Sequence, residues 1–293
     1  MKALYDVPAP AKLNLFLHIT GRRPDGYHLL QSVFMLVDWC DTLHFELRAS
    51  GQISREDSGI SLPEDDLIVR AARSLQQAVG CPAGVHIRLE KRIPVQAGMG
   101  GGSSDAASCL LALNRLWGLH LPLGPLEQIG LALGSDVPFF LRGRNAWVEG
   151  IGDQIHPVEV PFARFAVVKP HEGLDTASIF RDAALKRDSA PAIISGFAAN
   201  HEGLFPFGFG HNDLQPVAQR LCPTVTQALE WLGGQGLQAR MTGSGSAVFA
   251  QMPHEKSLLP APAGWQVREC GNLAVHPLLG WAVSDDFGGR PVS

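Results

Sequence analysis

The chain has 293 residues, of which 45% are hydrophobic, and this length and composition favour two packed domains. Its 24 lysine and arginine residues against 28 aspartate and glutamate residues give a formal charge of -4, so no overall basic field is present for nucleic acid or for an anionic membrane. The 5 cysteines are scattered without CxxC spacing, which indicates neither a disulfide framework nor a zinc site and fits a reducing cytoplasm.

The first predicted strand covers residues 13–19, where apolar and polar residues alternate and place Lys12 and Asn14 on one face. This run is far shorter than the roughly 20 apolar residues of a membrane helix, so no membrane association is expected. Considered alone, Lys12 is more simply interpreted as a solvated strand lysine.

A turn is predicted next, at residues 21–28, because Pro-Asp-Gly favours a reversal of the chain. The turn presents Tyr27 and His28 at the start of the apolar run 29–37. Considered alone, these two residues are equally well explained as an ordinary loop pair.

Helical spacing follows at residues 67–79, with Asp65 or Asp66 as the predicted N-cap and Gly80 as the stop. This helix is predicted to have a structural role rather than a functional one. An alternating strand is predicted after it at residues 85–89.

The stretch GMGGGSSD at residues 98–105 lies between that strand and an apolar helix at 106–117, for which Ser103 or Ser104 is the predicted cap. Four glycines in five residues leave backbone amides accessible beside the positive end of the helix dipole, which favours a bound phosphate. The alternative is a strained turn that needs glycine only for its dihedral angles. The stretch matches neither GxxxxGK[ST] nor GxGxxG with a downstream acid, so neither a P-loop nor a dinucleotide fold is predicted.

Asp136 introduces the apolar stretch VPFF. It is either a helix N-cap or a carboxylate at the edge of a dry site, and the cap is the simpler interpretation of the residue alone. A composition break at residues 157–161 follows a glycine-rich turn, which predicts two domains, 1–158 and 159–293.

The second half is predicted to begin with a strand at residues 165–168 and a helix capped by Thr176, in which Phe180 alone would be a core residue. Further helices are predicted from residues 212 and 223, and strands at 237–241 and 247–250 joined by a glycine-containing hairpin. No secondary structure is assigned to 187–211, and the last ten or so residues are expected to be frayed. Strands and helices without a βαβα rhythm predict an α+β fold in both domains.

Three blocks of the chain, taken together, resemble the GHMP family of small-molecule kinases: PAPAKLNLFLHI at 8–19, PVQAGMGGGSSDAA at 94–107 and MTGSGSAVFA at 241–250. Four more blocks narrow the resemblance to the members that act on a diphosphocytidyl methylerythritol: GRRPDGYHLLQSV at 21–33, DLIVRAA at 66–72, GSDVPFFL at 134–141 and ND at 212–213. The blocks span residues 8–250 and both predicted domains.

The resemblance implies a ribosomal-protein-S5-like N-terminal domain, a ferredoxin-like C-terminal domain and an active site between them. It implies transfer of the γ-phosphate of ATP, with magnesium, to the 2-hydroxyl of this small-molecule substrate. Asp136 would be the base and Lys12 would keep it ionised. The substrate would be bound by Asn14, Tyr27, His28, Thr176 and Phe180. ATP would be bound by Asp66, Lys91, Pro94, Val95, Gln96, Ala97, Gly98, Met99, Gly100, Gly101, Gly102, Ser103 and Ser104.

Two positions depart from the family pattern or vary within it. Asp66 stands where the family usually has asparagine, which concerns the adenine contact, and position 180 can be any aromatic in relatives. No paired carboxylates lie near the glycine loop, so the magnesium ligands are unassigned, with phosphates, waters and Ser104 as candidates. Two other functions stay open, a GHMP kinase for another alcohol and a non-catalytic ATP-binding relative, and the sequence does not decide between monomer and homodimer.

Overall fold

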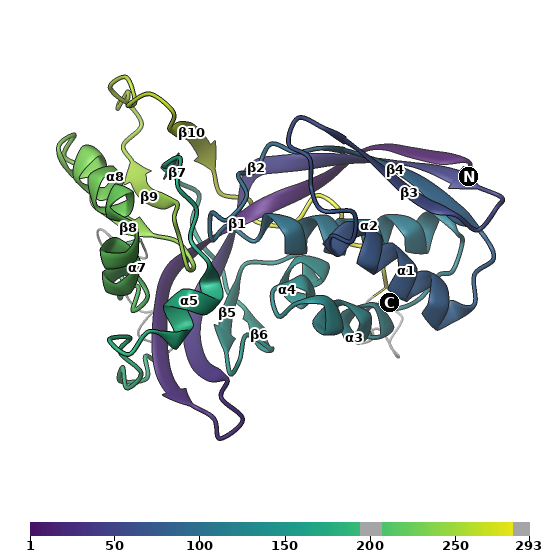
Figure 1. Cartoon of the computed structure of the whole chain (residues 1–293), viewed down its shortest axis with the longest axis horizontal. Helices are drawn as coiled ribbons and strands as arrows, with labels where there is room; N and C mark the ends of the chain where they lie inside the picture. Colours follow the sequence, from purple (N-terminus) through teal and green to yellow (C-terminus); the bar gives the residue numbers. More distant parts are fainter. Residues whose placement is uncertain (194–206, 284–293) are drawn as a thin grey trace, which may run out of the picture.

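The computed structural model describes residues 1–193 and 207–283, drawn in colour in Figure 1. The predicted frayed tail and residues 194–206 of the unassigned segment lie outside the described residues. The described parts of that segment, 187–193 and 207–211, contain no helix or strand, as predicted. In the described chain, no helix has the length and hydrophobicity needed to cross a membrane.

A mixed sheet forms the first half of the molecule. Among the described residues it has six strands in the order β3-β4-β2-β5-β6, with β1 along β2. The strands are β1 (Ala3–Arg22), β2 (His28–Arg48), β3 (Ile53–Ser58), β4 (Gly84–Glu90), β5 (Ala146–Glu149) and β6 (Gln154–Pro157). The long antiparallel hairpin of β1 and β2 contains the predicted strand 13–19, the predicted turn and the apolar run 29–37.

Four helices cover one face of this sheet, as Figure 1 shows. They are α1 (Leu67–Val79), α2 (Gly101–Leu116), α3 (Leu123–Leu133) and α4 (Val137–Arg142). Of the two predicted caps of α1, Asp66 is the one used: its carboxylate accepts a hydrogen bond from Val69 N, and Gly80 ends the helix in the left-handed conformation.

The predicted cap of α2 is wrong. The helix begins at Gly101 and its N-cap is Gly100, which has φ 69° and makes no side-chain hydrogen bond. Gly100 adopts a left-handed conformation that a serine would adopt only with strain. The turn into the helix is therefore made at this glycine, before the chain reaches Ser103. Ser103 and Ser104 therefore lie inside the first turn.

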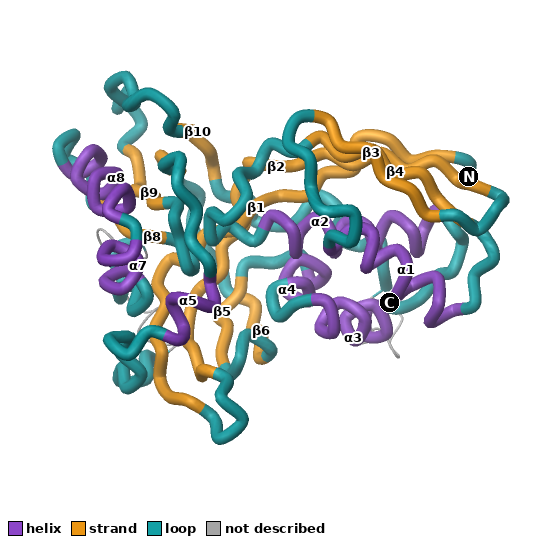
Figure 2. Tube along the Cα trace, in the orientation of Figure 1, coloured by secondary structure: helices purple, strands orange, loops and turns teal. Residues whose placement is uncertain are grey.

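The second half contains an antiparallel sheet, which among the described residues has four strands in the order β10-β7-β9-β8. They are β7 (Arg164–Lys169), β8 (Ala239–Met241), β9 (Val248–Met252) and β10 (Gln266–Gly271). The predicted hairpin is confirmed, since β8 and β9 pair directly. Helices α7 (Gln215–Leu221) and α8 (Pro223–Gly233) lie on the outer side of this sheet, and α5 (Thr176–Arg181) lies near β1 (Figure 2).

Both sheets contribute to one core that lies between them. Along β2, Val33 and Met35 face this shared core, whereas Phe34 and Leu36 face the helices of the first half. Along β7, Val167 also faces the shared core, and its neighbours face α7 and α8. A strand buried on both faces needs a nearly continuous apolar run, which explains the composition of residues 29–37.

The chain crosses back to the first half after β10. Leu273 N donates to Leu36 O at 2.9 Å, and His276 N donates to Gly143 O at 2.8 Å. Leu278 is buried in the core between the first sheet and its helices. This segment lies within the range predicted for the second domain, 159–293, but it packs against the first; the position of the boundary at 158 stays a prediction.

Candidate active site

A cavity of about 1270 Å³ is lined by both halves of the molecule. It is bordered by the glycine loop, β1, the turn before β2, α5 and the loop between β8 and β9. The structure brings nineteen of the predicted site residues to this cavity: Lys12, Asn14, Tyr27, His28, Asp66, Lys91, Pro94, Val95, Gln96, Ala97, Gly98, Met99, Gly100, Gly101, Gly102, Ser103, Asp136, Thr176 and Phe180.

Lys12 is not the solvated strand lysine that it would be if considered alone. It is only 4% exposed, and its Nζ lies 3.6 Å from Asp136 Oδ2. The same Nζ donates to Asn14 Oδ1 at 2.5 Å and lies 4.7 Å from the centre of the Phe34 ring. Burial lowers the pKa of Lys12, and the Asp136 carboxylate partly offsets this effect. The cation is therefore held in one position by groups on β1, β2 and α4.

Asp136 occupies the N-cap position of α4 but makes no capping hydrogen bond. Its side chain is 27% exposed and pairs with Lys12 instead. The structure thus favours the second of the two sequence interpretations, a carboxylate at the edge of a largely apolar site. Asn14 is also fixed, because its Nδ2 donates to Ser32 Oγ at 2.9 Å and its backbone N donates to Thr242 Oγ1 at 2.9 Å.

The glycine loop lies directly against β1 and α4. Lys12 N donates to Met99 O at 2.9 Å, and a Cβ added at Gly100 would lie 3.0 Å from the Phe140 ring. The first amides of α2 have no partner within the helix and belong to residues that line the cavity. Gly98 and Gly100 have positive φ, so the loop needs glycine at these positions for its dihedral angles, and phosphate binding by its amides stays a prediction.

Ser104 is the exception among the predicted ligand-binding residues. Its Oγ donates to Pro10 O at 2.7 Å, its backbone N donates to Gly100 O at 2.9 Å, and the side chain is fully buried. Both of its donors are therefore used inside the protein. Ser103, one residue earlier, lines the cavity and is the serine available to a ligand or ion.

The loop between β8 and β9 packs against the glycine loop, which the sequence did not predict. Ser246 N donates to Gln96 O at 3.2 Å, and Ala247 N donates to Ala97 O at 3.3 Å. Gly243, Ser244 and Gly245 line the cavity. The GSG pattern alone is explained equally well by a hairpin, and the resemblance of residues 241–250 to a family block was the one other signal.

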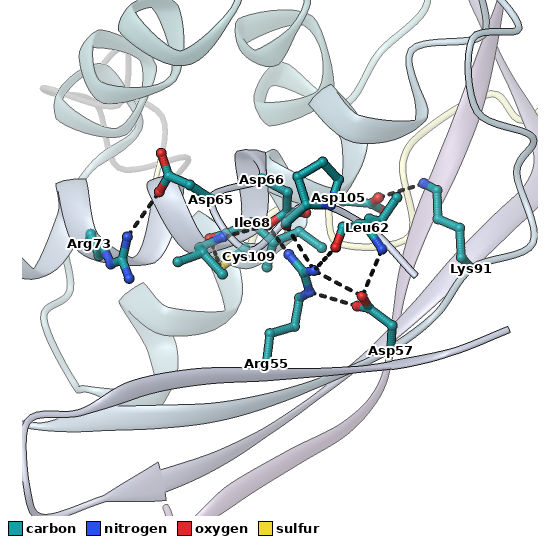
Figure 3. A network of polar contacts seen from close by, with 12 residues as sticks. Arg55, Asp57, Leu62, Asp65, Asp66, Ile68, Arg73, Lys91, Asp105 and Cys109 are labelled. Atoms are coloured by element: carbon teal, nitrogen blue, oxygen red, sulfur yellow. Dashed lines mark hydrogen bonds and ion pairs between the residues drawn. The ribbon is translucent and has the colours of Figure 1, made fainter. Parts of the chain in front are cut away.

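Asp66 and Lys91 are both engaged in internal ion pairs, shown in Figure 3. Asp66 pairs with Arg55 in addition to capping α1. Lys91 donates to Asp105 Oδ2 at 2.6 Å and also pairs with Asp41, and both carboxylates are fully buried. Burial alone would lower the pKa of Lys91, but the two carboxylates raise it. Both side chains border the cavity with their charges already paired inside the protein.

The opposite end of the cavity is formed by the turn before β2 and by α5. Tyr27 is 62% exposed, and the ring centres of His28 and Phe180 lie 5.0 Å apart. Thr176 Oγ1 lies 2.7 Å from Ser244 Oγ. The prediction that Thr176 caps α5 is wrong. Asp175 is the N-cap, because its carboxylate accepts a hydrogen bond from Ser178 N. Phe180 is only partly buried and borders the cavity, so it is not a core residue.

Sequence reasoning missed several charged residues at this end of the cavity. Arg22, Arg181 and Arg187 line it. Within the described residues, no group of three or more His, Cys, Asp or Glu side chains lies close enough to hold a metal ion. The arginines give this end of the cavity positive charge that can attract an anionic ligand.

Two α+β halves that line one cavity, with a glycine loop at a helix start beside a buried lysine paired with an aspartate, are the arrangement of a kinase of small molecules. The family models described as GHMP kinases N terminal domain and GHMP kinases C terminal match residues 66–144 and 186–258. The chain belongs to the GHMP kinase family.

Two relatives of high identity within that family have the same name. It is 68% identical to the 4-diphosphocytidyl-2-C-methyl-D-erythritol kinase of Variovorax paradoxus, over 97% of this chain and 100% of the relative. It is 70% identical to the kinase of the same name from Albidiferax ferrireducens, over 97% of this chain and 98% of the relative. A crystal structure of 4-(cytidine 5'-diphospho)-2C-methyl-D-erythritol kinase has a TM-score of 0.72 and 36% identity, covering 85% of this chain and 89% of that one.

Proposed function

We propose that this chain phosphorylates the 2-hydroxyl of 4-diphosphocytidyl-2-C-methyl-D-erythritol with ATP, giving the 2-phosphate and ADP, in non-mevalonate isoprenoid precursor biosynthesis. The observation that carries the proposal is one cavity with three parts: a glycine loop, the Lys12–Asp136 pair and an aromatic end formed by Tyr27 and Phe180. High identity to kinases of that name over nearly the whole chain supports the choice of substrate.

Asp136 is assigned as the base. As the 2-hydroxyl oxygen attacks the γ-phosphorus, the carboxylate accepts the hydroxyl proton, the bond from the γ-phosphorus to the bridging oxygen breaks, and ADP leaves. Lys12 lies 3.6 Å from the carboxylate and keeps a positive charge beside the reacting oxygens. The hydrogen bond from Lys12 to Asn14 fixes the direction of the ammonium group, so Asn14 acts here by positioning.

The glycine loop is assigned to the triphosphate of ATP. The amides of Gly101, Gly102 and Ser103 begin a sixteen-residue helix, so unpaired donors and the positive end of the helix dipole act together on an anion. Lys91 lies immediately behind the loop, since a Cβ added at Gly101 would lie 3.1 Å from its Nζ. We assign Lys91 and Asp66 to support of the nucleotide site, because both side chains are already paired.

The base of the substrate is assigned to the opposite end of the cavity. Tyr27 and Phe180 offer aromatic faces for stacking, and His28 offers a polar edge between them. Thr176 and Ser244 are hydrogen-bonded to each other and lie between this end and the glycine loop, where they can contact the middle of the substrate.

Magnesium fits this site only in part. Side-chain oxygens near the loop are offered by Ser103, Ser135 and Asp136, whereas Asp105 is paired with Lys91 and Ser104 is buried away from the cavity. The protein would therefore supply one or two ligands, and phosphate oxygens and water the others, as is usual for this ion. When bound, magnesium neutralises phosphate charge during transfer.

The cellular location is proposed to be the cytoplasm. All five cysteines are free in the structure, and three of them are buried, as a reducing compartment allows.

The test is an ADP-release assay with the full chain and magnesium-ATP. We expect turnover with 4-diphosphocytidyl-2-C-methyl-D-erythritol, and none with homoserine or mevalonate at the same concentration. Replacement of Asp136 by Asn should abolish turnover while ATP still binds. Preference for another alcohol would identify a different GHMP kinase, and ATP binding without turnover of any alcohol would identify a non-catalytic relative.

A further inference from the structure

One arginine outside the predicted site contacts the base-recognition end of the cavity. Arg187 follows α5, and its Nε donates to His28 Nε2 at 3.1 Å. A guanidinium group carries five N–H donors and no acceptor, and it stays charged at any ordinary pH. The nitrogen that faces it must therefore accept, so His28 Nε2 carries no proton.

Arg187 is held in this position by the backbone around the end of α5. Its Nη1 donates to Leu185 O at 2.9 Å, and its Nη2 donates to Phe180 O at 3.1 Å and to Asp182 O at 2.7 Å. These carbonyls belong to the last turn of α5 and the residues that follow it, where acceptors have no helical partner. The guanidinium is thus fixed by three contacts that do not involve His28.

His28 accepts a hydrogen bond from a cation, which an imidazolium ring could not do, and is therefore neutral. Partial burial, followed by the nearby charges of Arg187 and Arg22, lowers the pKa of its ring. A neutral imidazole has one protonated nitrogen, and with Nε2 accepting from Arg187 the proton lies on Nδ1. Among the described residues, Nδ1 has no hydrogen-bond partner, and His28 lines the cavity with its ring against Phe180.

We propose that Arg187 is a positioning residue that fixes the Nδ1–H tautomer of His28, so that the ring presents a donor to the pyrimidine and favours cytosine over uracil. Cytosine N3 is an acceptor, whereas uracil carries a proton on N3. An Nδ1–H donor pairs with the N3 acceptor of cytosine. In uracil it meets the N3–H donor instead, which leaves two donors without a partner. The selection of cytosine rests on the proposed function; the tautomer does not.

The tautomer is measured without substrate. Long-range proton–nitrogen correlation spectra of the ¹⁵N-labelled full chain at pH 7.5 distinguish protonated from unprotonated ring nitrogens, and the His28 signals are assigned by their loss in His28→Gln. We expect the proton on Nδ1 in the wild type and in Arg187→Lys, which keeps a donor. In Arg187→Glu an acceptor faces the ring, and the proton should move to Nε2.

The kinetic consequence is measured with the cytidine substrate and its uridine analogue. Arg187→Glu should lower kcat/KM for the cytidine substrate by about 10-fold or more, with a smaller loss for the uridine analogue and an unchanged KM for ATP. Lys186→Glu makes the same charge change at the neighbouring exposed residue and should leave both substrates unaffected.

The outcomes separate the two proposals. A wild-type His28 protonated on Nε2 would overturn the role of Arg187 even if the enzyme turned over normally, and this result does not depend on any variant folding. An Arg187→Glu variant with unchanged discrimination between the two bases would overturn the selection of cytosine. A chain with the Nδ1–H tautomer that does not phosphorylate the cytidine substrate would instead refute the proposed function.

Discussion

Replacing Gly98 by Ala should push the glycine loop away from the loop between β8 and β9, where the two loops meet at the cavity. Gly98 has φ 70°, so a side chain there costs about 1 kcal/mol before any contact is considered. A Cβ would lie 2.2 Å from Thr242 O and 2.8 Å from Gly245 N, both backbone atoms that cannot rotate away. Ordinary contact begins at 3.4 Å, so the loops must move apart by about 1 Å.

A displacement of this size at a phosphate-binding loop has a large kinetic effect. A misplacement of about 1 Å can cost about 100-fold in rate when the reacting groups depend on position. We therefore expect Gly98→Ala to lose about 100-fold in kcat/KM, measured by ADP release with purified folded protein.

Gly84→Ala is the matched control. A Cβ at Gly84 would lie 2.1 Å from Gln52 O, a backbone clash as severe as that at Gly98, but at the start of β4 and away from the cavity. It should lower thermal stability and leave kcat/KM per folded molecule unchanged. Wild-type kcat/KM in Gly98→Ala, or an equal loss in both variants, would refute the view that contact between the loops positions the phosphate site.

Three further predictions concern buried ionisable side chains. Lys12→Met should lower kcat by about 100-fold or more in steady-state assays, since the cation beside Asp136 is lost while the apolar stem still packs on Phe34; retention of more than a tenth of the activity would contradict this role. Lys91→Met leaves Asp41 and Asp105 buried without a cation and should cost about 3 to 5 kcal/mol in urea unfolding; an unchanged midpoint would show that the carboxylates do not need it. Burial lowers the pKa of His276 to about 4. The unfolded chain therefore takes up this proton first as the pH falls below about 6.5, and the resulting loss of stability reaches about 2 kcal/mol at pH 5. His276→Asn should remove that part of the acid sensitivity when unfolding is compared at pH 7.5 and pH 5, and an equal loss in both proteins would contradict the assignment.

Local patterns in the sequence predicted the elements that carry the site. Alternation at residues 13–19 placed Lys12 and Asn14 on one face, and the two side chains are hydrogen-bonded there. The glycines predicted a helix start with accessible amides. Among the described residues, four short or polar strands escaped prediction: β3 and β10 are outer strands with mostly polar residues, and β5 and β6 have four residues each. Strands of this kind owe their conformation to their neighbours more than to their own pattern.

Contacts between distant residues could not be predicted from local patterns. Asp41 and Lys91 are fifty residues apart, and Arg187 meets His28 across 159 residues. In both pairs, the sequence pattern around one residue does not predict its partner. Capping residues were misassigned for a different reason, since Asp175 and Thr176 are adjacent and both are favoured caps, so only the backbone conformation decides between them.

Two places where the described chain passes between the halves lie side by side. Ala163 N donates to Asn272 Oδ1 at 2.7 Å, and Asn272 N donates to Ala163 O at 3.2 Å. In topological terms the second half is an insertion whose ends leave and re-enter the first at a single point. An inserted segment anchored in this way can change in length without moving the ends of its host. Lys12, Asp136 and the glycine loop all lie before Ala163 in the chain, so a change of length within the second half would leave their positions in the first half unchanged.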